Sequence, residues 1–222
     1  MKGSAGAKVV ILRADSGTLI WSSGRSNRLN TTLLKMIAEG AALSPAVTLR
    51  ENTREGIAPD FDSFGYRRPD EVVLIEQGRY KDCLVSPRSA KEYGVATNGV
   101  TAEEMPESVE MSAGSIGSAE LLNELGTGVW VDNLWYLNYS DRPACRFTGM
   151  TRFATFWVEG GRIVAPLNVM RFDETIYRAL GENLVGLTKE REMILSSDTY
   201  FRRSTASARL PGALIDAFSF TL

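Results

Sequence analysis

The sequence predicts an α+β protein built mainly from antiparallel β-sheet, with three or four helices interspersed along the chain. Two patterns support this class: most apolar runs are short and alternate as strands do, and two pairs of runs are joined by glycine turns typical of hairpins. Composition is the third observation. A chain of 222 residues that is 44% hydrophobic and 23% charged is typical of a globular protein with its own core.

The first seventy residues predict two short strands, one helix and a long loop. Residues 9–12 and 47–49 are apolar runs of strand length. Between them, apolar residues at helical spacing predict a helix that ends at Gly40. These residues are Leu29, Leu33, Met36 and Ile37. Residues 51–69 are polar and lack periodicity, so we expect a long loop, which is usually either functional or disordered.

Two predicted hairpins resemble each other. Residues 72–85 turn at Gly78, and residues 154–167 turn at Gly161. Both turns read Glu-x-Gly-Arg, and glycine at the second position of a two-residue turn is typical of a type I′ turn, in which both central residues have positive φ. Either an internal duplication or the suitability of this sequence for hairpins explains the similarity, and both interpretations stay open.

The rest of the chain alternates helices and strands. Ser118 begins a short predicted helix that ends at Leu125, and residues 128–139 are apolar on both alternating faces, as in a strand buried on both sides. Asp173 is expected to cap a further helix. The apolar face of that helix comprises Ile176, Tyr177, Leu180 and Leu184. Residues 217–222 alternate again and predict a final strand.

Residue types exclude several kinds of active site. The chain contains no histidine, so it has neither a His-x-x-x-His zinc helix nor a Ser–His–Asp triad. Its two cysteines, Cys83 and Cys145, lack the spacing of a zinc site, and we expect both to be reduced. We therefore predict no catalytic residue, no metal ligand and no cofactor in this chain.

Charge and hydropathy exclude two classes of partner. The net charge of −2 lacks the basic excess that is typical of nucleic-acid-binding proteins. No apolar run approaches the roughly 20 residues that span a bilayer, and the N-terminus lacks the apolar core of a signal peptide. We therefore expect a cytoplasmic protein that binds neither nucleic acid nor a membrane.

Three sequence features can carry chemistry but have simpler structural interpretations. Ser86 and Ser89 precede Lys91, which a capped helix explains better than a Ser–Lys nucleophile. Residues 114–118 can cradle an anion at a helix N-terminus, although no lysine follows them. An acidic cluster offers either a divalent-cation site or, more simply, a solvated face. The cluster comprises Glu103, Glu104, Glu107 and Glu110.

Residues 133–152 are the best candidate for a binding face. This segment combines aromatic and arginine side chains, which most often anchor interfaces. The candidate peptide- or partner-binding residues are Trp135, Tyr136, Tyr139, Arg142, Arg146 and Arg152. Together with Arg171, the arginines of this set can clamp a peptide carboxylate. The alternative is a core strand followed by an ordinary loop, with its arginines on the surface.

Two segments resemble the C-terminal domain of the TldD/TldE metalloprotease family, also called PmbA. They are residues 133–143 (NLWYLNYSDRP) and 148–159 (TGMTRFATFWVE). Supporting segments are residues 50–56 (RENTREG), 74–80 (LIEQGRY), 86–89 (SPRS) and 169–174 (VMRFDE). The resemblance implies a barrel-like C-terminal domain at residues 46–222. It makes residues 1–45, with their strand and helix, a remnant of a linker or of an N-terminal domain.

In that family, TldD subunits bind zinc through a His-Glu-x-x-x-His helix and a distant cysteine, whereas TldE subunits lack these ligands and pair with TldD. The pair is a cytosolic protease that cleaves unfolded or extended peptides, including leader peptides of modified natural products. Because this chain has no histidine, the resemblance implies a TldE-like, non-catalytic subunit or domain that contributes peptide binding and assembly.

The resemblance also implies partners. They are a TldD-like subunit that carries the zinc, or a second copy of this chain, together with a peptide substrate. The alternative is a stand-alone peptide-binding or assembly module that has no protease partner.

Overall fold

The structure is a computed structural model that describes residues 6–14, 32–62, 64–98, 100, 104–197, 199 and 203–221. Leu29 of the predicted first helix and Glu103 of the acidic cluster lie outside the described residues. The chain divides into two compact units. Unit 1 comprises Met1–Leu19, Ala113–Arg191 and Pro211–Leu222, and unit 2 comprises Ile20–Ser112 and Glu192–Leu210.

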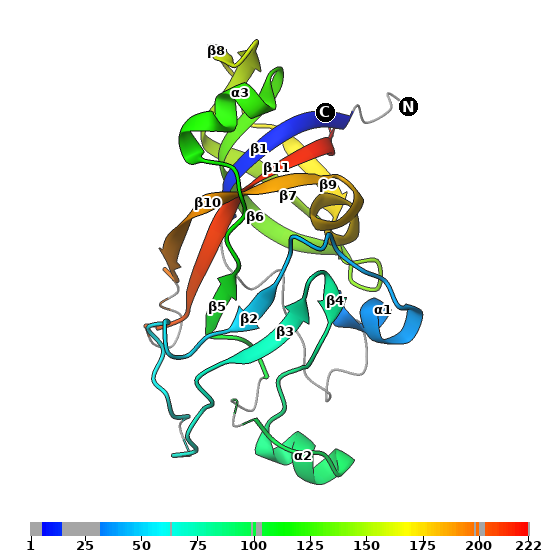
Figure 1. Cartoon of the computed structure of the whole chain (residues 1–222), viewed down its shortest axis with the longest axis vertical. Helices are drawn as coiled ribbons and strands as arrows, with labels where there is room; N and C mark the ends of the chain where they lie inside the picture. The colour runs from blue at the N-terminus through cyan, green and yellow to red at the C-terminus, as the bar shows by residue number, and fades with distance from the viewer. Residues whose placement is uncertain are drawn as a thin grey trace. The chain divides into compact units, whose positions relative to one another are not determined.

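Unit 1 is built around strands that close into a barrel. They are β1 (Gly6–Ala14), β6 (Gly128–Asp141), β7 (Arg146–Glu159), β9 (Arg171–Thr175) and the later part of β11 (Ser207–Thr221). β1 pairs in parallel with β6, and antiparallel pairs of β6 with β7, β7 with β9, β9 with β11 and β11 with β1 complete the ring. In Figure 1, the blue strand β1 and the red strand β11 lie side by side.

Further elements extend this barrel. β8 (Arg162–Pro166) pairs with β7, and β10 (Leu184–Leu195) pairs with β11. The short helix α3 (Leu121–Leu125) follows a 3-10 turn, η1 (Ser118–Glu120), and a π-helical turn, η2 (Arg178–Glu182), follows β9.

Inward-facing apolar side chains fill the barrel, because alternate residues of each strand point to its interior. The buried cluster comprises Val9, Ile11, Val129, Val131, Leu134, Phe172, Ala179, Ile215 and Phe218. The rings of Phe172 and Phe218 pack with their centroids 5.3 Å apart. Full burial of a large apolar side chain contributes about 1.5–3 kcal/mol. The cluster, with Phe147 and Trp157 of β7 packed against it, therefore holds the strands β6, β7 and β9 in place.

Within its described residues, unit 2 contains a smaller sheet and two helices. Its strands β2 (Leu49–Glu51), β3 (Val72–Glu76), β4 (Arg79–Tyr80) and β5 (Ser108–Met111) pair antiparallel in the order β5-β2-β3-β4. The first residues of β11 pair in parallel with β5. The helices are α1 (Thr32–Glu39) and α2 (Pro87–Tyr93), and α2 ends at Gly94, whose φ is 64°.

The predicted class is confirmed for a β-rich chain with few helices, but the expectation of a mainly antiparallel sheet is partly wrong. The sheet is mixed, since β1 pairs in parallel with β6 and β5 in parallel with β11. Parallel neighbours need a long connection, and here they join segments far apart in the sequence. Both predicted hairpins form, with the positive φ of a type I′ turn at residues 77, 78, 160 and 161. The first is shorter than predicted, because its second strand ends at Tyr80.

The helix predicted to begin at Asp173 is wrong at its start. Asp173 lies within β9, whose residues pair with both β7 and β11, and helical geometry begins only at Ile176. The last residue of the predicted apolar face, Leu184, begins β10. Within the described residues, no helix has the length and apolar character that crossing a membrane requires. The division into residues 1–45 and 46–222 stays a prediction.

Candidate functional site

Strands β6, β7 and β9 of unit 1 share an outer face that carries several of the predicted binding residues. Leu134 and Phe172 belong to the barrel core, so their neighbours along the strands point outward. Trp135 lies opposite Met150, Met150 lies opposite Arg171, and Arg152 is two residues further along β7. We define the β6–β7–β9 patch as Trp135, Tyr136, Met150, Arg152, Phe153 and Arg171.

Two aromatic residues of the patch adopt the left-handed backbone region. Tyr136 has a φ of 54° and lies where the β6–β7 register shifts, and Phe153 has a φ of 62°. This region is unfavourable for bulky side chains, and irregular strand geometry re-aims the residues that adopt it. Tyr136 is 67% exposed and Phe153 is 70% exposed. The strands therefore hold two aromatic rings in solvent at a conformational cost, as is common at binding sites.

Arg152 joins the charged and aromatic parts of the patch. Its guanidinium carbon lies 3.9 Å from the centroid of the Trp135 ring and 5.0 Å from that of Phe153. Cation–π attraction of this kind contributes about 0.5–1 kcal/mol at exposed sites. A stacked guanidinium keeps its N–H donors at the edge of its plane. Among the described residues, no carboxylate lies within ion-pair distance of Arg152 or Arg171.

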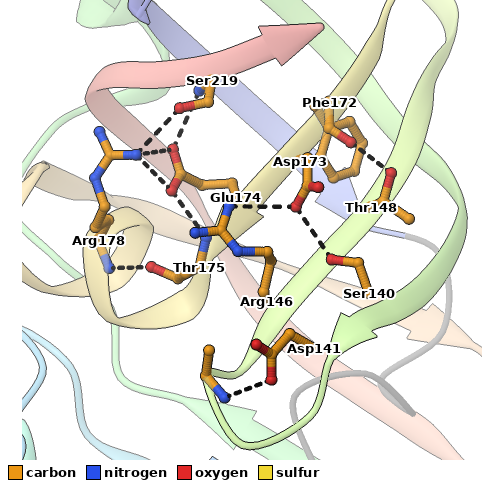
Figure 2. Close-up of polar contacts among 11 residues, drawn as sticks. Ser140, Asp141, Arg146, Thr148, Phe172, Asp173, Glu174, Thr175, Arg178 and Ser219 are labelled. Atoms are coloured by element: carbon orange, nitrogen blue, oxygen red, sulfur yellow. Dashed lines mark hydrogen bonds and ion pairs between the residues drawn. The ribbon is translucent and has the colours of Figure 1, made fainter. Parts of the chain in front are cut away.

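The other predicted binding residues lie nearer the end of the β6–β7 hairpin. The Arg142 guanidinium lies 5.5 Å from the centroid of the Tyr139 ring. Arg146 lies 3.5 Å from a carboxylate oxygen of Asp173, which also accepts a hydrogen bond from the Ser140 hydroxyl at 3.1 Å (Figure 2). Because Arg146 is paired inside unit 1, it suits an external carboxylate less well than the arginines of the patch.

A buried carboxylate fixes the turn after β9. The fully buried Glu174 accepts hydrogen bonds from the Arg178 guanidinium at 2.9 and 3.1 Å and from the backbone N–H groups of Ser219 and Thr175 (Figure 2). Arg178 also donates to the Ser219 hydroxyl and to the carbonyl of Ala217. These contacts tie η2 to β9 and β11, so the pair has a structural role and supports the strand that carries one arginine of the patch.

Of the three described glutamates of the acidic cluster, Glu104 and Glu110 are buried and Glu107 is half-buried, so the expectation of a solvated face is wrong for these residues. Glu104 is fully buried and accepts the backbone N–H of the residue that caps α2. Glu107 lies 3.0 Å from the Arg68 guanidinium, and Glu110 accepts a hydrogen bond from the Asn52 amide at 3.1 Å. These carboxylates have protein partners, which explains how their charges are accommodated away from water.

Two further sequence features also have structural roles. Ser86 caps α2 by accepting a hydrogen bond from the backbone N–H of Ser89 at 3.2 Å. Within residues 114–118, Ser118 donates from its hydroxyl and its N–H to Glu190 at 2.7 and 2.8 Å, and these bonds lower the pKa of that carboxyl. The donors of Ser118 are therefore already occupied by a side chain of the protein, which disfavours the predicted anion site.

The family resemblance implies zinc in some subunits, and the residues of this chain do not fit that metal. Protein zinc sites are built from cysteine, histidine and carboxylate ligands. The sequence has no histidine, and the two buried cysteines, Cys145 and Cys83, belong to unit 1 and unit 2 respectively. In the part of the chain that the structure describes, no group of three or more Cys, Asp or Glu side chains is placed to hold a metal ion.

Part of the candidate site is predicted by the sequence. Trp135, Tyr136 and Arg152 are predicted and lie together, whereas Phe153 is not predicted and Arg171 has only a general role in an arginine cluster. No sequence pattern predicts a positive φ at a phenylalanine, so the sequence does not predict that the Phe153 side chain is exposed. The alternation of apolar and polar residues from Met170 to Asp173 is a signal for a strand that contains Arg171, whereas the pairing of that strand with β7 is seen only in the structure. The binding roles of all these residues stay predictions.

Comparison with known proteins gives one family and several similar structures. Residues 11–222 match the model of the PmbA/TldA metallopeptidase C-terminal domain. TldE from Thermococcus kodakarensis is similar with a TM-score of 0.72 and 17% identity, over 100% of this chain and 51% of that chain. No curated protein sequence matches the chain.

Two proteins described as candidate DNA gyrase modulators also share the fold. The one from Thermotoga maritima has a TM-score of 0.74 and 17% identity, over 99% of this chain and 50% of that chain. The one from Bacteroides thetaiotaomicron has a TM-score of 0.72 and 19% identity, over 100% and 48%. The chain therefore spans about half the length of these similar structures.

Proposed function

The chain belongs to the PmbA/TldA metallopeptidase family through that family's C-terminal domain, and from this premise we propose that it is the zinc-free subunit or domain of a TldD/TldE-type protease complex. The complex acts on extended or unfolded peptides, and this chain contributes peptide binding and assembly. A TldD-like partner holds the zinc and carries out hydrolysis. A second copy of this chain is the other partner that the proposal allows.

The observation that carries the proposal is the complete absence of histidine from a chain of a metallopeptidase family. Catalytic zinc sites use histidine in most proteases and keep one position open for water. A chain without these ligands still serves a protease if it binds the substrate or completes the partner's surface. That role needs exposed aromatic and arginine side chains, which are the usual anchors of interfaces.

The β6–β7–β9 patch has this composition, and Tyr139 and Arg142 extend it toward the end of the hairpin. Arg152 and Arg142 both lie over aromatic rings at the surface. Stacking of this kind orders a long side chain before binding, so less conformational entropy is lost when a ligand binds. We therefore assign peptide or partner recognition to this face of unit 1.

A cytoplasmic location stays a prediction.

The assignment is tested with the double variant Arg142→Ala/Arg152→Ala. We expect its binding to a TldD-like subunit, or to an unfolded peptide, to weaken by about tenfold or more, while its melting temperature stays nearly unchanged. The matched control is Arg162→Ala, which removes an exposed arginine of β8 and should leave binding intact. If the double variant binds with wild-type affinity, the assignment of binding to Arg142 and Arg152 is wrong. If the variant unfolds, these arginines are structural.

A further inference from the structure

We propose that the β6–β7–β9 patch selects extended peptides that carry two carboxylates at alternate positions, i and i+2, with Arg152 and Arg171 as their partners. This inference rests on the proposed peptide-binding function and names the class of peptide. It follows from three properties of the patch: the register of its two arginines, their lack of carboxylate partners among the described residues, and the aromatic rings beside Arg152.

The register places the two arginines at a spacing that matches an extended peptide. Arg171 of β9 lies opposite Met150, and Arg152 is two residues along β7 from Met150, on the same face. Diagonal neighbours of this kind are separated by roughly 7–8 Å. Alternate side chains of an extended chain leave the same side at intervals of roughly 6.5–7 Å. This spacing is that of the backbone positions. The Arg152 guanidinium itself lies over Trp135 of β6, on the other side of β7 from Arg171, so the long arginine side chains bridge the remaining distance to carboxylates at i and i+2.

Charge makes these two positions suited to an external acidic ligand. Arg146, on the same outer face, is neutralised by Asp173, and Arg178 is neutralised by the buried Glu174. No carboxylate among the described residues does the same for Arg152 or Arg171. Guanidinium–carboxylate pairs are frequently bidentate and are stronger than neutral hydrogen bonds. Arg152 and Arg171 can therefore each bind one carboxylate of an incoming peptide.

Aromatic rings beside Arg152 add apolar contact. Trp135 supports the Arg152 guanidinium, and Phe153 lies 5.0 Å from it. Tyr136 directly follows Trp135 and is mostly exposed. Such rings supply large contact areas at low entropic cost. We therefore expect an apolar side chain next to the acidic pair to increase affinity.

The proposal is tested by fluorescence anisotropy with the full chain and a labelled, unstructured peptide that contains Glu-Leu-Glu. The comparison peptides contain Gln-Leu-Gln, adjacent Glu-Glu, or Glu residues three positions apart. We expect the Glu-Leu-Glu peptide to bind about tenfold more tightly than the Gln peptide and more tightly than both other spacings. Added salt should reduce this preference, because surface charge interactions are screened.

Variants assign the effect to the two arginines. Arg152→Gln and Arg171→Gln should each reduce binding of the Glu-Leu-Glu peptide by about five- to tenfold and bring it close to that of the Gln peptide. Neither variant should lower the melting temperature by more than about 4 °C. Arg162→Gln on β8 removes the same charge away from the patch and should have no effect. An equal loss in Arg162→Gln would show a general charge effect and would overturn the proposal.

The outcomes separate this inference from the function on which it rests. If all peptides bind equally, the acidic preference is wrong, while peptide binding by the chain stands. If no peptide binds but a TldD-like subunit does, the patch is an assembly surface and the inference is wrong. If the chain binds neither peptide nor subunit, both the inference and the proposed function fail.

Discussion

Tyr136 and Phe153 are residues whose backbone conformation costs stability and whose side chains gain little from burial. A left-handed conformation costs an L-residue about 1–2 kcal/mol, whereas glycine in its place costs about 0.5–1 kcal/mol in chain entropy. We predict that Tyr136→Gly and Phe153→Gly leave the free energy of unfolding unchanged or slightly raised. Both should weaken peptide binding, because the exposed rings are lost.

Urea unfolding and peptide anisotropy on the same samples check this pair of effects. Tyr93→Ala, on helix α2 of unit 2, is a control for the loss of an aromatic ring away from the patch and should not alter peptide affinity. A loss of more than about 1 kcal/mol in either glycine variant would show that the ring is part of the packed structure.

Glu51 gives the stability of the protein a specific pH dependence. Burial raises the pKa of its carboxyl above 4.5, although hydrogen bonds from the N–H groups of Ser108 and Glu107 and the charge of Arg68 act in the opposite direction. A folded-state pKa above the unfolded value means that the folded protein binds this proton more tightly. The resulting stabilisation is complete below pH 4.5 and is lost as the pH rises through the folded pKa.

The variant Glu51→Gln removes this titration. We predict that wild-type stability falls relative to that of Glu51→Gln as the pH rises from below 4.5 toward neutrality. Urea unfolding at a series of pH values measures the difference. A constant difference across this range would mean that the Glu51 carboxyl has no raised pKa.

At the scale of elements, the turns of the two hairpins provide two glycines at different turn positions, one crowded and one open. Gly78 and Gly160 both have positive φ, at 77° and 54°. A side chain at Gly78 would lie 2.3 Å from the Leu43 carbonyl oxygen, whereas one at Gly160 would meet no atom within 4 Å. We predict that Gly160→Ala costs about 1 kcal/mol, from backbone conformation alone, and that Gly78→Ala costs about 1–3 kcal/mol more. Denaturant unfolding of both variants compares the costs, and equal values would contradict the close approach.

Hairpins could be predicted from the sequence because their signals are local, whereas the segment after Asp173 could not. Apolar spacing in residues 176–184 predicts a helix, but the pairing of β9 with β7 extends regular strand geometry to Thr175. Such pairs join residues distant in sequence, and tertiary contacts override local propensity. For the same reason, the sequence does not show that Arg171 lies beside β7.

At the scale of the whole molecule, closure of the barrel joins β1 near the start of the chain to β11 near its end. No local pattern predicts a pairing of this separation, and the barrel-like expectation came only from the family resemblance. The repeated turn sequence occurs once in each unit, in β3–β4 and in β7–β8. That distribution fits both an internal duplication and two independent hairpins, so the question stays open.

The central claim is that this chain serves a metalloprotease without holding its metal, and one measurement tests it directly. Purified protein is analysed for zinc and assayed for cleavage of an unstructured peptide, alone and after addition of a TldD-like subunit with a His-Glu-x-x-x-His helix. We predict no stoichiometric zinc and no cleavage for the chain alone, and cleavage in the mixture above that of the partner by itself. Stoichiometric zinc together with peptidase activity in the isolated chain would contradict the account.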